Sequence, residues 1–158
     1  FQEKYQQAKL VEAGMPKDFQ VVQNSLSYNK DKGVIRGFHA EPWDKYISVI
    51  TGKVFAAYVD LRDGESFGRV ETIEITPNVA VYLPQGVANS FQTIEDNTYY
   101  LYSVNKFWSA DDYEKYAFVN LADPDIAMTW PIPLGQATMS DRDKQHPLLK
   151  DIKPLEVR

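Results

Sequence analysis

The feature that most constrains the fold of this chain is a series of short runs rich in β-branched and aromatic residues. Turn residues separate the runs, and Thr51-Gly52 and Asp63-Gly64 are pairs typical of β-hairpins. Because no helical pattern lies between the runs, the sequence predicts an all-β sandwich or barrel rather than an alternating β/α fold. The candidate strands cover residues 33–40, 45–50, 53–61, 70–75, 79–83, 88–93 and 98–104.

The run from residue 54 to residue 59 indicates how these strands are covered. Side chains alternate between the two faces of a strand, and both faces of this run are apolar. We therefore expect the strand to be buried on both sides. One face carries Val54, Ala56 and Tyr58, and the other carries Phe55, Ala57 and Val59.

The two ends of the chain have a different texture. Residues 2–13 predict a short amphipathic helix that stops at Gly14 and Pro16. From Ser109 onward the chain is rich in Asp and Pro and predicts an irregular segment with one short helix near residues 140–145. The length of 158 residues predicts a single domain, and the start at Phe1 rather than Met indicates a missing N-terminus.

Composition excludes several classes of function. The net charge of -5 argues against general nucleic-acid binding, which needs basic stripes. No apolar run has the length of a membrane span, and no signal peptide opens the chain. With no Cys there is neither a disulfide framework nor a thiolate metal site. We expect a cytoplasmic protein without nucleic-acid or membrane partners.

The chain has only two histidines. Strict alternation puts Arg36 and Phe38 on one face of their strand and Gly37 and His39 on the other, where Gly37 leaves space beside the imidazole. The segment alone leaves an ordinary strand histidine and a functional one equally open. His146, near the C-terminus, is expected to be a surface residue.

These residues favour proton transfer over metal chemistry. Since one histidine lies in the strand region and no second falls at ligand spacing, we expect neither a metal ion nor a cofactor. Lys45 could stabilise an oxyanion. The possible proton donors are Tyr82, Tyr99, Tyr100 and Tyr102, although most tyrosines in such strands serve packing.

Six motifs resemble, in order and at compatible spacing, those of the dTDP-4-dehydrorhamnose 3,5-epimerase family. Together they span residues 23–149, and chance agreement of all six is not credible. The segments are G-V-I-R-G-F-H at 33–39, D-L-R-D-G at 60–64 with F-G at 67–68, P-Q-G-V-A-N-S-F at 84–91, the strand of Tyr102, D-P-D through W-P at 123–131, and S-D-R-D at 140–143 with P-L-L at 147–149.

The resemblance implies a jelly-roll fold of the cupin type over residues 1–158, without the family's N-terminal strand. It implies inversion of C3 and C5 of dTDP-4-dehydro-6-deoxy-D-glucose, a step of dTDP-L-rhamnose biosynthesis. It also implies a dTDP-sugar ligand, a homodimer, and no cofactor.

The resemblance further implies roles for eight residues. His39 matches the general base and Asp143 its partner, Lys45 matches the lysine that stabilises the enolate, and Tyr102 matches the acid on the opposite face of the sugar. The implied substrate contacts are Arg36 to phosphate, Gln23, Trp108 against the thymine base, and Asn89.

Two departures leave alternatives open. Asn89 replaces a histidine of the common pattern, and the loop H-A-E-P-W-D-K at 39–45 is shorter than usual, as in one subgroup of the family. An epimerase that inverts only C3 or only C5 shares the same acid and base. A 4-keto-sugar isomerase lacks the R-G-x-H and S-x-x-D pair, and a non-catalytic sugar-binding jelly roll has no reason to keep all four catalytic positions.

Overall fold

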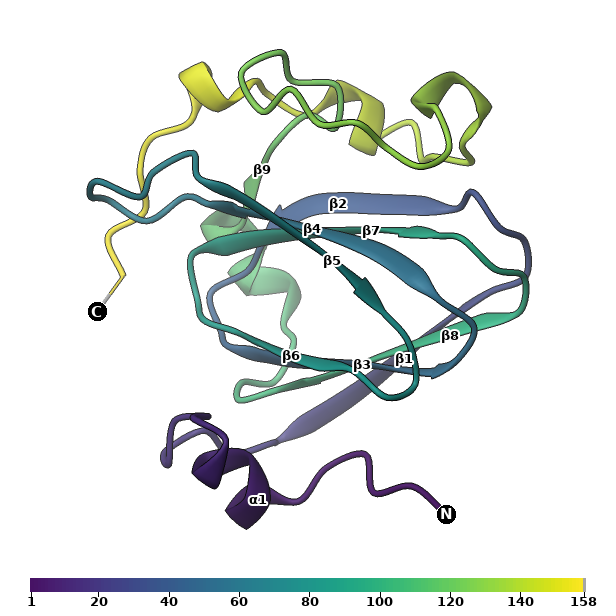
Figure 1. Cartoon of the computed structure of the whole chain (residues 1–158). Helices are drawn as coiled ribbons and strands as arrows, with labels where there is room; N and C mark the ends of the chain where they lie inside the picture. Colours follow the sequence, from purple (N-terminus) through teal and green to yellow (C-terminus); the bar gives the residue numbers. More distant parts are fainter. Residues whose placement is uncertain (158) are drawn as a thin grey trace.

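The computed structural model describes residues 1–157, whose strands form two antiparallel sheets packed face to face (Figure 1). One sheet has the order β1-β8-β3-β6 and the other β5-β4-β7-β2-β9. The predicted all-β sandwich is therefore confirmed. The strands are β1 Gln23–Asn29, β2 Ile35–Ala40, β3 Lys45–Thr51, β4 Val54–Asp60, β5 Val70–Ile75, β6 Ala80–Leu83, β7 Val87–Thr93, β8 Thr98–Val104 and β9 Ala117–Phe118.

Strand β1 was not predicted, because its apolar side chains face solvent and its polar side chains face the interior. Leu26 and Tyr28 point outward and are half exposed, whereas Ser25 and Ser27 point inward. β1 pairs with β8 along its whole length, so the backbone ladder holds it in place. Its polar inner face borders the cavity described below.

Strand β4 is buried on both sides, as its alternation predicted. Val54, Ala56 and Tyr58 lie in the core between the sheets. Ala57 and Val59 lie in a second core, on the outer face of the sheet, that also contains Phe38 and Trp130. The chain after β9 forms the far side of this second core and lies across the sheet of β2, β4 and β7 (Figure 1).

The N-terminal helix α1, Gln7–Glu12, is shorter than predicted. Residues 2–6 are not helical, because Lys4 donates hydrogen bonds to the carbonyls of Val49 and Pro77, at 2.8 and 2.7 Å. The segment packs Met15 and Phe19 against Tyr46 on the outer face of the β1-β8-β3-β6 sheet.

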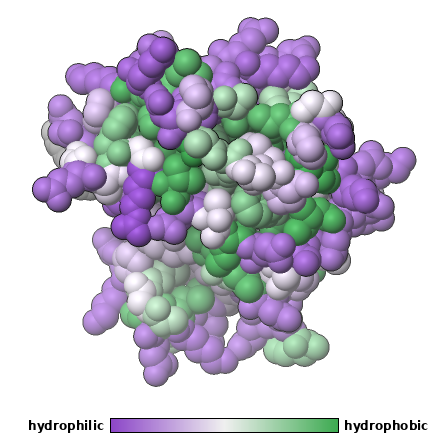
Figure 2. All heavy atoms as spheres, turned by 45° about the horizontal axis from the view of Figure 1, so that its top comes forward, coloured by the Kyte–Doolittle hydropathy of each residue, from purple (hydrophilic) through white to green (hydrophobic). Residues whose placement is uncertain are grey.

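The C-terminal segment has little regular structure. It contains short 3₁₀ turns, and the helix predicted at residues 140–145 is one of them. Its surface mixes apolar and hydrophilic side chains (Figure 2). No helix within residues 1–157 has the length and hydropathy needed to cross a membrane. The turns are η1 Ala110–Lys115, η2 Leu134–Gln136, η3 Asp143–Gln145 and η4 Leu149–Asp151.

Candidate active site

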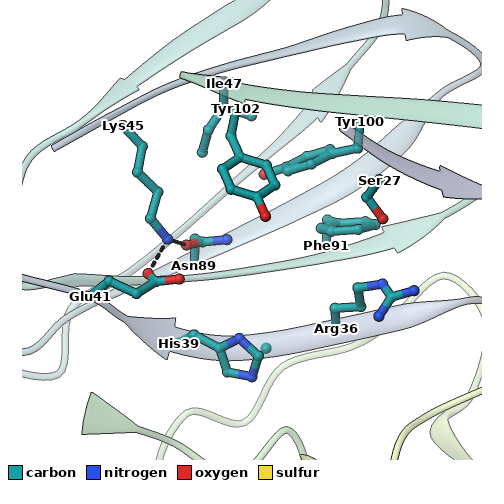
Figure 3. Close-up of a pocket in the computed structure, with 11 residues that line it drawn as sticks. Ser27, Arg36, His39, Glu41, Lys45, Ile47, Asn89, Phe91, Tyr100 and Tyr102 are labelled. Atoms are coloured by element: carbon teal, nitrogen blue, oxygen red, sulfur yellow. Dashed lines mark hydrogen bonds and ion pairs between the residues drawn. The ribbon is translucent and has the colours of Figure 1, made fainter. Parts of the chain in front are cut away.

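A cavity of about 250 Å³ lies between the two sheets (Figure 3). Strands of both sheets supply its walls, so residues far apart in the sequence face one another across it. Five of the eight predicted site residues line it, namely Arg36, His39, Lys45, Asn89 and Tyr102. The remaining lining residues are Ser27, Gly37, Glu41, Ile47, Phe91 and Tyr100.

Strand β2 does not follow the strict alternation that its sequence predicted. Arg36 and His39 both face the cavity, while Phe38 is fully buried in the outer core. The register against β7 shifts between Arg36 and His39, which is a β-bulge that re-aims side chains. The prediction that paired Arg36 with Phe38 was therefore wrong.

The predicted empty space beside His39 at Gly37 is also wrong. Gly37 has φ +114°, and a Cβ placed there would lie 2.5 Å from the carbonyl oxygen of Asn89. The glycine serves the close approach of two backbones, which is what permits the bulge.

His39 is hydrogen-bonded to a carboxylate that the sequence placed 104 residues away. Its Nε2 lies 2.9 Å from Oδ1 of Asp143, and Asp143 is buried in turn η3 while His39 is about one-third exposed. Burial alone would raise the pKa of Asp143, but the hydrogen bond and charge of His39, with Ser140, hold that pKa below its usual value. An ionised carboxylate thus orients the imidazole from behind.

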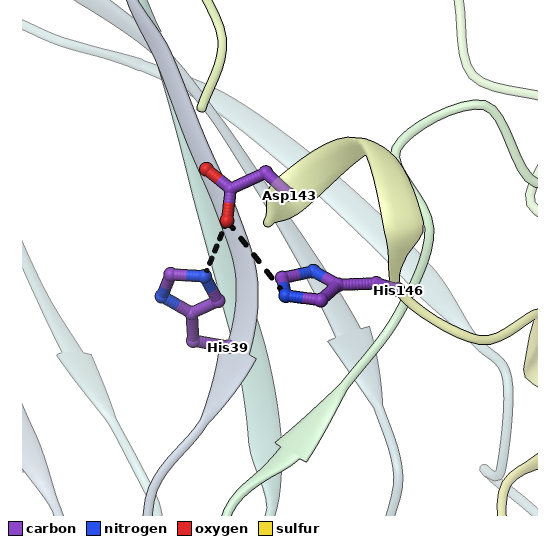
Figure 4. A group of neighbouring side chains, drawn as sticks. All are labelled: His39, Asp143 and His146. Atoms are coloured by element: carbon purple, nitrogen blue, oxygen red, sulfur yellow. Dashed lines mark hydrogen bonds and ion pairs between the residues drawn. The ribbon is translucent and has the colours of Figure 1, made fainter. Parts of the chain in front are cut away.

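His146 is buried, contrary to the prediction of a surface residue. Its ring stacks on Phe118, with centroids 4.7 Å apart, and its Nε2 lies 3.8 Å from the same Oδ1 of Asp143 (Figure 4). The sequence held one signal for this: His146 follows Asp143 by three residues, and side chains at that spacing align in a 3₁₀ turn.

The expectation that no second histidine lies at ligand spacing from His39 is wrong, because folding brings His146 close to it. His39, Asp143 and His146 each offer a donor atom, and these atoms lie within 4.8 Å of one another. The direct hydrogen bond between His39 and Asp143 Oδ1 is the arrangement of a base with its orienting carboxylate. The three side chains therefore offer both a set of metal-ligand atoms and a base with its orienting carboxylate.

Lys45 enters the cavity from β3, and its ammonium is buried between Glu41 and Asn89 (Figure 3). The ion pair with Glu41 and the hydrogen bond to the amide oxygen of Asn89 offset the cost of burying the charge. Sequence reasoning did not identify Glu41. Its place four residues before Lys45, at the start of a tight loop, was the available signal.

Only some of the candidate tyrosines face the cavity. Tyr99 packs against Tyr28, and Tyr82 against Phe19, with centroids 4.7 and 5.4 Å apart. Tyr100 lines the cavity but is buried and stacked on Phe91, and burial raises its pKa well above the usual value. Tyr102 points its hydroxyl into the space between Arg36 and His39 and is less buried (Figure 3).

The last two predicted residues lie beside a second, outer groove of about 560 Å³. His39 lines this groove as well as the cavity, together with Trp108, Tyr113, Phe118 and Arg142, among others. Trp108 is 59% exposed, and its backbone N–H donates to Oε1 of Gln23 at 3.0 Å. A small polar cavity thus adjoins a wider aromatic groove, with the His39 imidazole between them.

The fold and the site together define a jelly-roll protein of the cupin type with a cavity, lined by charged and aromatic side chains, between its sheets. A family model described as dTDP-4-dehydrorhamnose 3,5-epimerase matches residues 1–151. The chain belongs to this family. Its members are epimerases, which are a class of isomerase.

Individual relatives agree with the family. The chain is 47% identical to the protein RmlC homolog of Streptococcus pyogenes serotype M6, over all of this chain and 81% of the relative. It is similar, with a TM-score of 0.92 and 45% identity, to the structure of RmlC from Streptococcus suis in complex with dTDP-D-xylose, over 99% of this chain and 81% of that one. It is 32% identical to a dTDP-4-dehydro-6-deoxyglucose 3-epimerase of a Streptomyces species, over 84% of this chain and 68% of the relative.

Proposed function

We propose that this chain inverts C3 and C5 of dTDP-4-dehydro-6-deoxy-D-glucose to give dTDP-4-dehydro-L-rhamnose, in dTDP-L-rhamnose biosynthesis. One observation carries the proposal: His39 and Tyr102 enter a single cavity from opposite sheets, with the Lys45 ammonium beside them. Inversion requires a base on one face of the sugar ring and an acid on the other.

His39 is the proposed base. The hydrogen bond to Asp143 is made by Nε2, which leaves Nδ1 as the nitrogen that accepts a proton from carbon. Asp143 fixes the orientation of the ring and stabilises the imidazolium that forms. The protons at C3 and C5 both flank the C4 ketone, so the same base serves each centre in turn.

Lys45 is the proposed stabiliser of the enolate. Removing a proton from C3 or C5 moves negative charge onto the C4 oxygen, and a buried ammonium held in place is suited to it. Glu41 and Asn89 fix the Lys45 side chain before substrate arrives. This positioning spares the reorganisation that a free lysine would undergo during the reaction.

Tyr102 is the proposed acid. It enters from β8, across the cavity from β2, and returns a proton to the face opposite His39. Tyr100 is less suited, because its buried hydroxyl has a pKa raised well above the usual value. A weaker acid in a fully packed position gives up its proton less readily.

The nucleotide is proposed to occupy the outer groove. Trp108 offers an exposed indole face for stacking on thymine, and Gln23 fixes the backbone that carries it. Arg36 is exposed at the edge of the cavity, where its guanidinium can bind a phosphate in a bidentate way. Asn89 is a proposed hydrogen-bonding partner of the sugar.

A homodimer, implied by the sequence resemblance, and a cytoplasmic location, inferred from composition, remain predictions. Sedimentation equilibrium of the purified chain tests the first. A mass of twice 18.1 kDa is expected, and a single-chain mass at all concentrations would contradict it.

The second candidate function is inversion at C3 alone. The chain is 32% identical to an enzyme named as a 3-epimerase, and this similarity supports the second candidate. The same cavity, base and acid serve either outcome, because both centres flank one ketone.

Proton exchange tests these functions directly. The chain is incubated with dTDP-4-dehydro-6-deoxyglucose in heavy water, and deuterium at C3 and C5 is followed by NMR. Label at both carbons supports the proposal, and label at C3 alone supports the second candidate. No label with tight binding would indicate a sugar-binding protein instead.

A further inference from the structure

His146 occupies a position that a histidine rarely tolerates. It is 8% exposed, and neither ring nitrogen meets a hydrogen-bond partner among the described residues. An unsatisfied buried polar group destabilises a fold, so packing alone does not account for a histidine at this position. The proposed mechanism so far uses only His39 and Asp143.

The unsatisfied imidazole lies directly against the proposed base and its carboxylate. His146 Nε2 lies 3.8 Å from Asp143 Oδ1, the atom that already binds His39. The two imidazole rings meet edge to face, with centroids 5.4 Å apart. This separation is longer than a hydrogen bond, so Asp143 or His146 must shift for a second N–H to reach this oxygen.

An Asp–His pair carries an inherent difficulty as a base. A carboxylate beside an imidazole favours the charged form of the ring, and a protonated ring cannot accept a proton from carbon. A group that reduces the attraction between the Asp143 carboxylate and a protonated His39 favours the neutral imidazole, which is the form that can act as a base.

We propose that His146 is a positioning residue that shares the Asp143 carboxylate and thereby keeps His39 unprotonated. The proposal rests on the role of His39 as base. A neutral His146 directs its N–H at Oδ1 and withdraws part of the negative charge from His39. A protonated His146 opposes the protonation of His39 by direct repulsion.

The charges around His146 agree with this role. Burial, and after it the proximity of His39, lower its pKa, and Arg142 on the same turn acts in the same direction. Asp143 and the main chain of Val119 act in the opposite direction. The lowered pKa favours the neutral form of His146, in which one ring nitrogen carries an N–H that can be donated.

Two variants separate this role from packing. His146→Phe keeps an aromatic ring on Phe118 but removes both nitrogens. His146→Gln keeps a neutral N–H donor. Thermal melting of each variant establishes that it is folded before activity is compared.

The first readout is the pH profile of kcat/KM for proton exchange. In His146→Phe we expect the acid limb to move to higher pH by about half a unit, which is roughly a threefold loss at pH 6. At pH 8.5 we expect a change of less than about twofold, and His146→Gln should restore most of the wild-type profile. An equal loss at every pH would show a structural role and overturn the proposal.

The second readout does not depend on catalysis. Because the chain has two histidines, the variant has a single histidine signal in NMR of 13Cε1-labelled protein. We expect that signal to titrate at higher pH in His146→Phe than the matching signal of the wild type. An unchanged titration overturns the proposal even in an active enzyme. If exchange is absent but the titration moves, the proposed function fails while the coupling of the two histidines stands.

Discussion

The strands from residue 23 to residue 104 and the chain that follows them contribute to the site in different ways. The strands present His39, Lys45 and Tyr102 from hydrogen-bonded sheets. The later chain has, among its described residues, only the two-residue strand β9 and short 3₁₀ turns, yet it places Asp143 and His146 against His39. The difference teaches that the sheets place the groups proposed to move protons, whereas the irregular segment sets the charge around the base.

The largest effect is expected from the strand side of this comparison. His39→Ala removes the proposed base, so kcat for exchange at C3 and C5 should fall on the order of 10³-fold. NMR in heavy water measures the loss. A tyrosine variant away from the cavity, Tyr99→Phe, is the control that should retain full activity.

The irregular segment comes next. Asp143→Asn leaves the shape of the side chain but cannot stabilise an imidazolium, and we expect kcat to fall on the order of 10²-fold with little change in KM. Steady-state kinetics of the epimerase reaction provide the measurement. If kcat falls by less than about threefold, Asp143 does not assist the base, and the proposed difference between the strands and the later chain is contradicted.

Gly37 tests whether the bulge in β2 requires a glycine. Gly37→Ala forces a Cβ to within 2.5 Å of the Asn89 carbonyl at φ +114°, and should destabilise the fold by about 2 kcal/mol or more. Urea unfolding measures the change. Gly14→Ala is the matched control, since Gly14 has φ +105° and no atom within 4 Å of the added Cβ, and it should cost about 1 kcal/mol.

The strands were largely predictable from the sequence because their cores impose period two. β4 shows this best, since each of its faces meets a different core. β1 was missed because its inner face is polar where it borders the cavity. Ser27 on that face lines the cavity, and an apolar pattern can reveal only a strand face that packs against a core.

The site was predictable only in part. The family motifs implied that His39 and Asp143 pair, as they do in the structure, whereas their spacing of 104 residues alone would not have indicated it. His146 and Glu41 were missed because each acts through a neighbour brought close by folding. The orientation of Arg36 was predicted wrongly because alternation of side chains assumes a regular strand. The bulge between Arg36 and His39 interrupts that alternation at Gly37.

The smallest effect concerns stability and pH. Folding lowers the pKa of His146, so below about pH 6.5 the unfolded chain binds more protons than the folded chain. The free energy of unfolding therefore decreases as the pH falls from about 6.5 through the pKa of His146 in the folded state. Between pH 7 and 5.5, the melting temperature of the wild type should therefore fall by about 2 °C more than that of His146→Phe. Equal slopes would show that His146 is not desolvated in solution.

The central claim is that acid and base act from opposite sheets, and Tyr102→Phe tests it most directly. His39 is exposed enough to exchange its proton with solvent. In heavy water the variant should therefore still incorporate deuterium at C3 or C5, returned to the original face, while inversion is lost. Tyr99→Phe, on the same strand, should exchange and invert like the wild type. Inversion that survives in Tyr102→Phe at the wild-type rate would contradict the account.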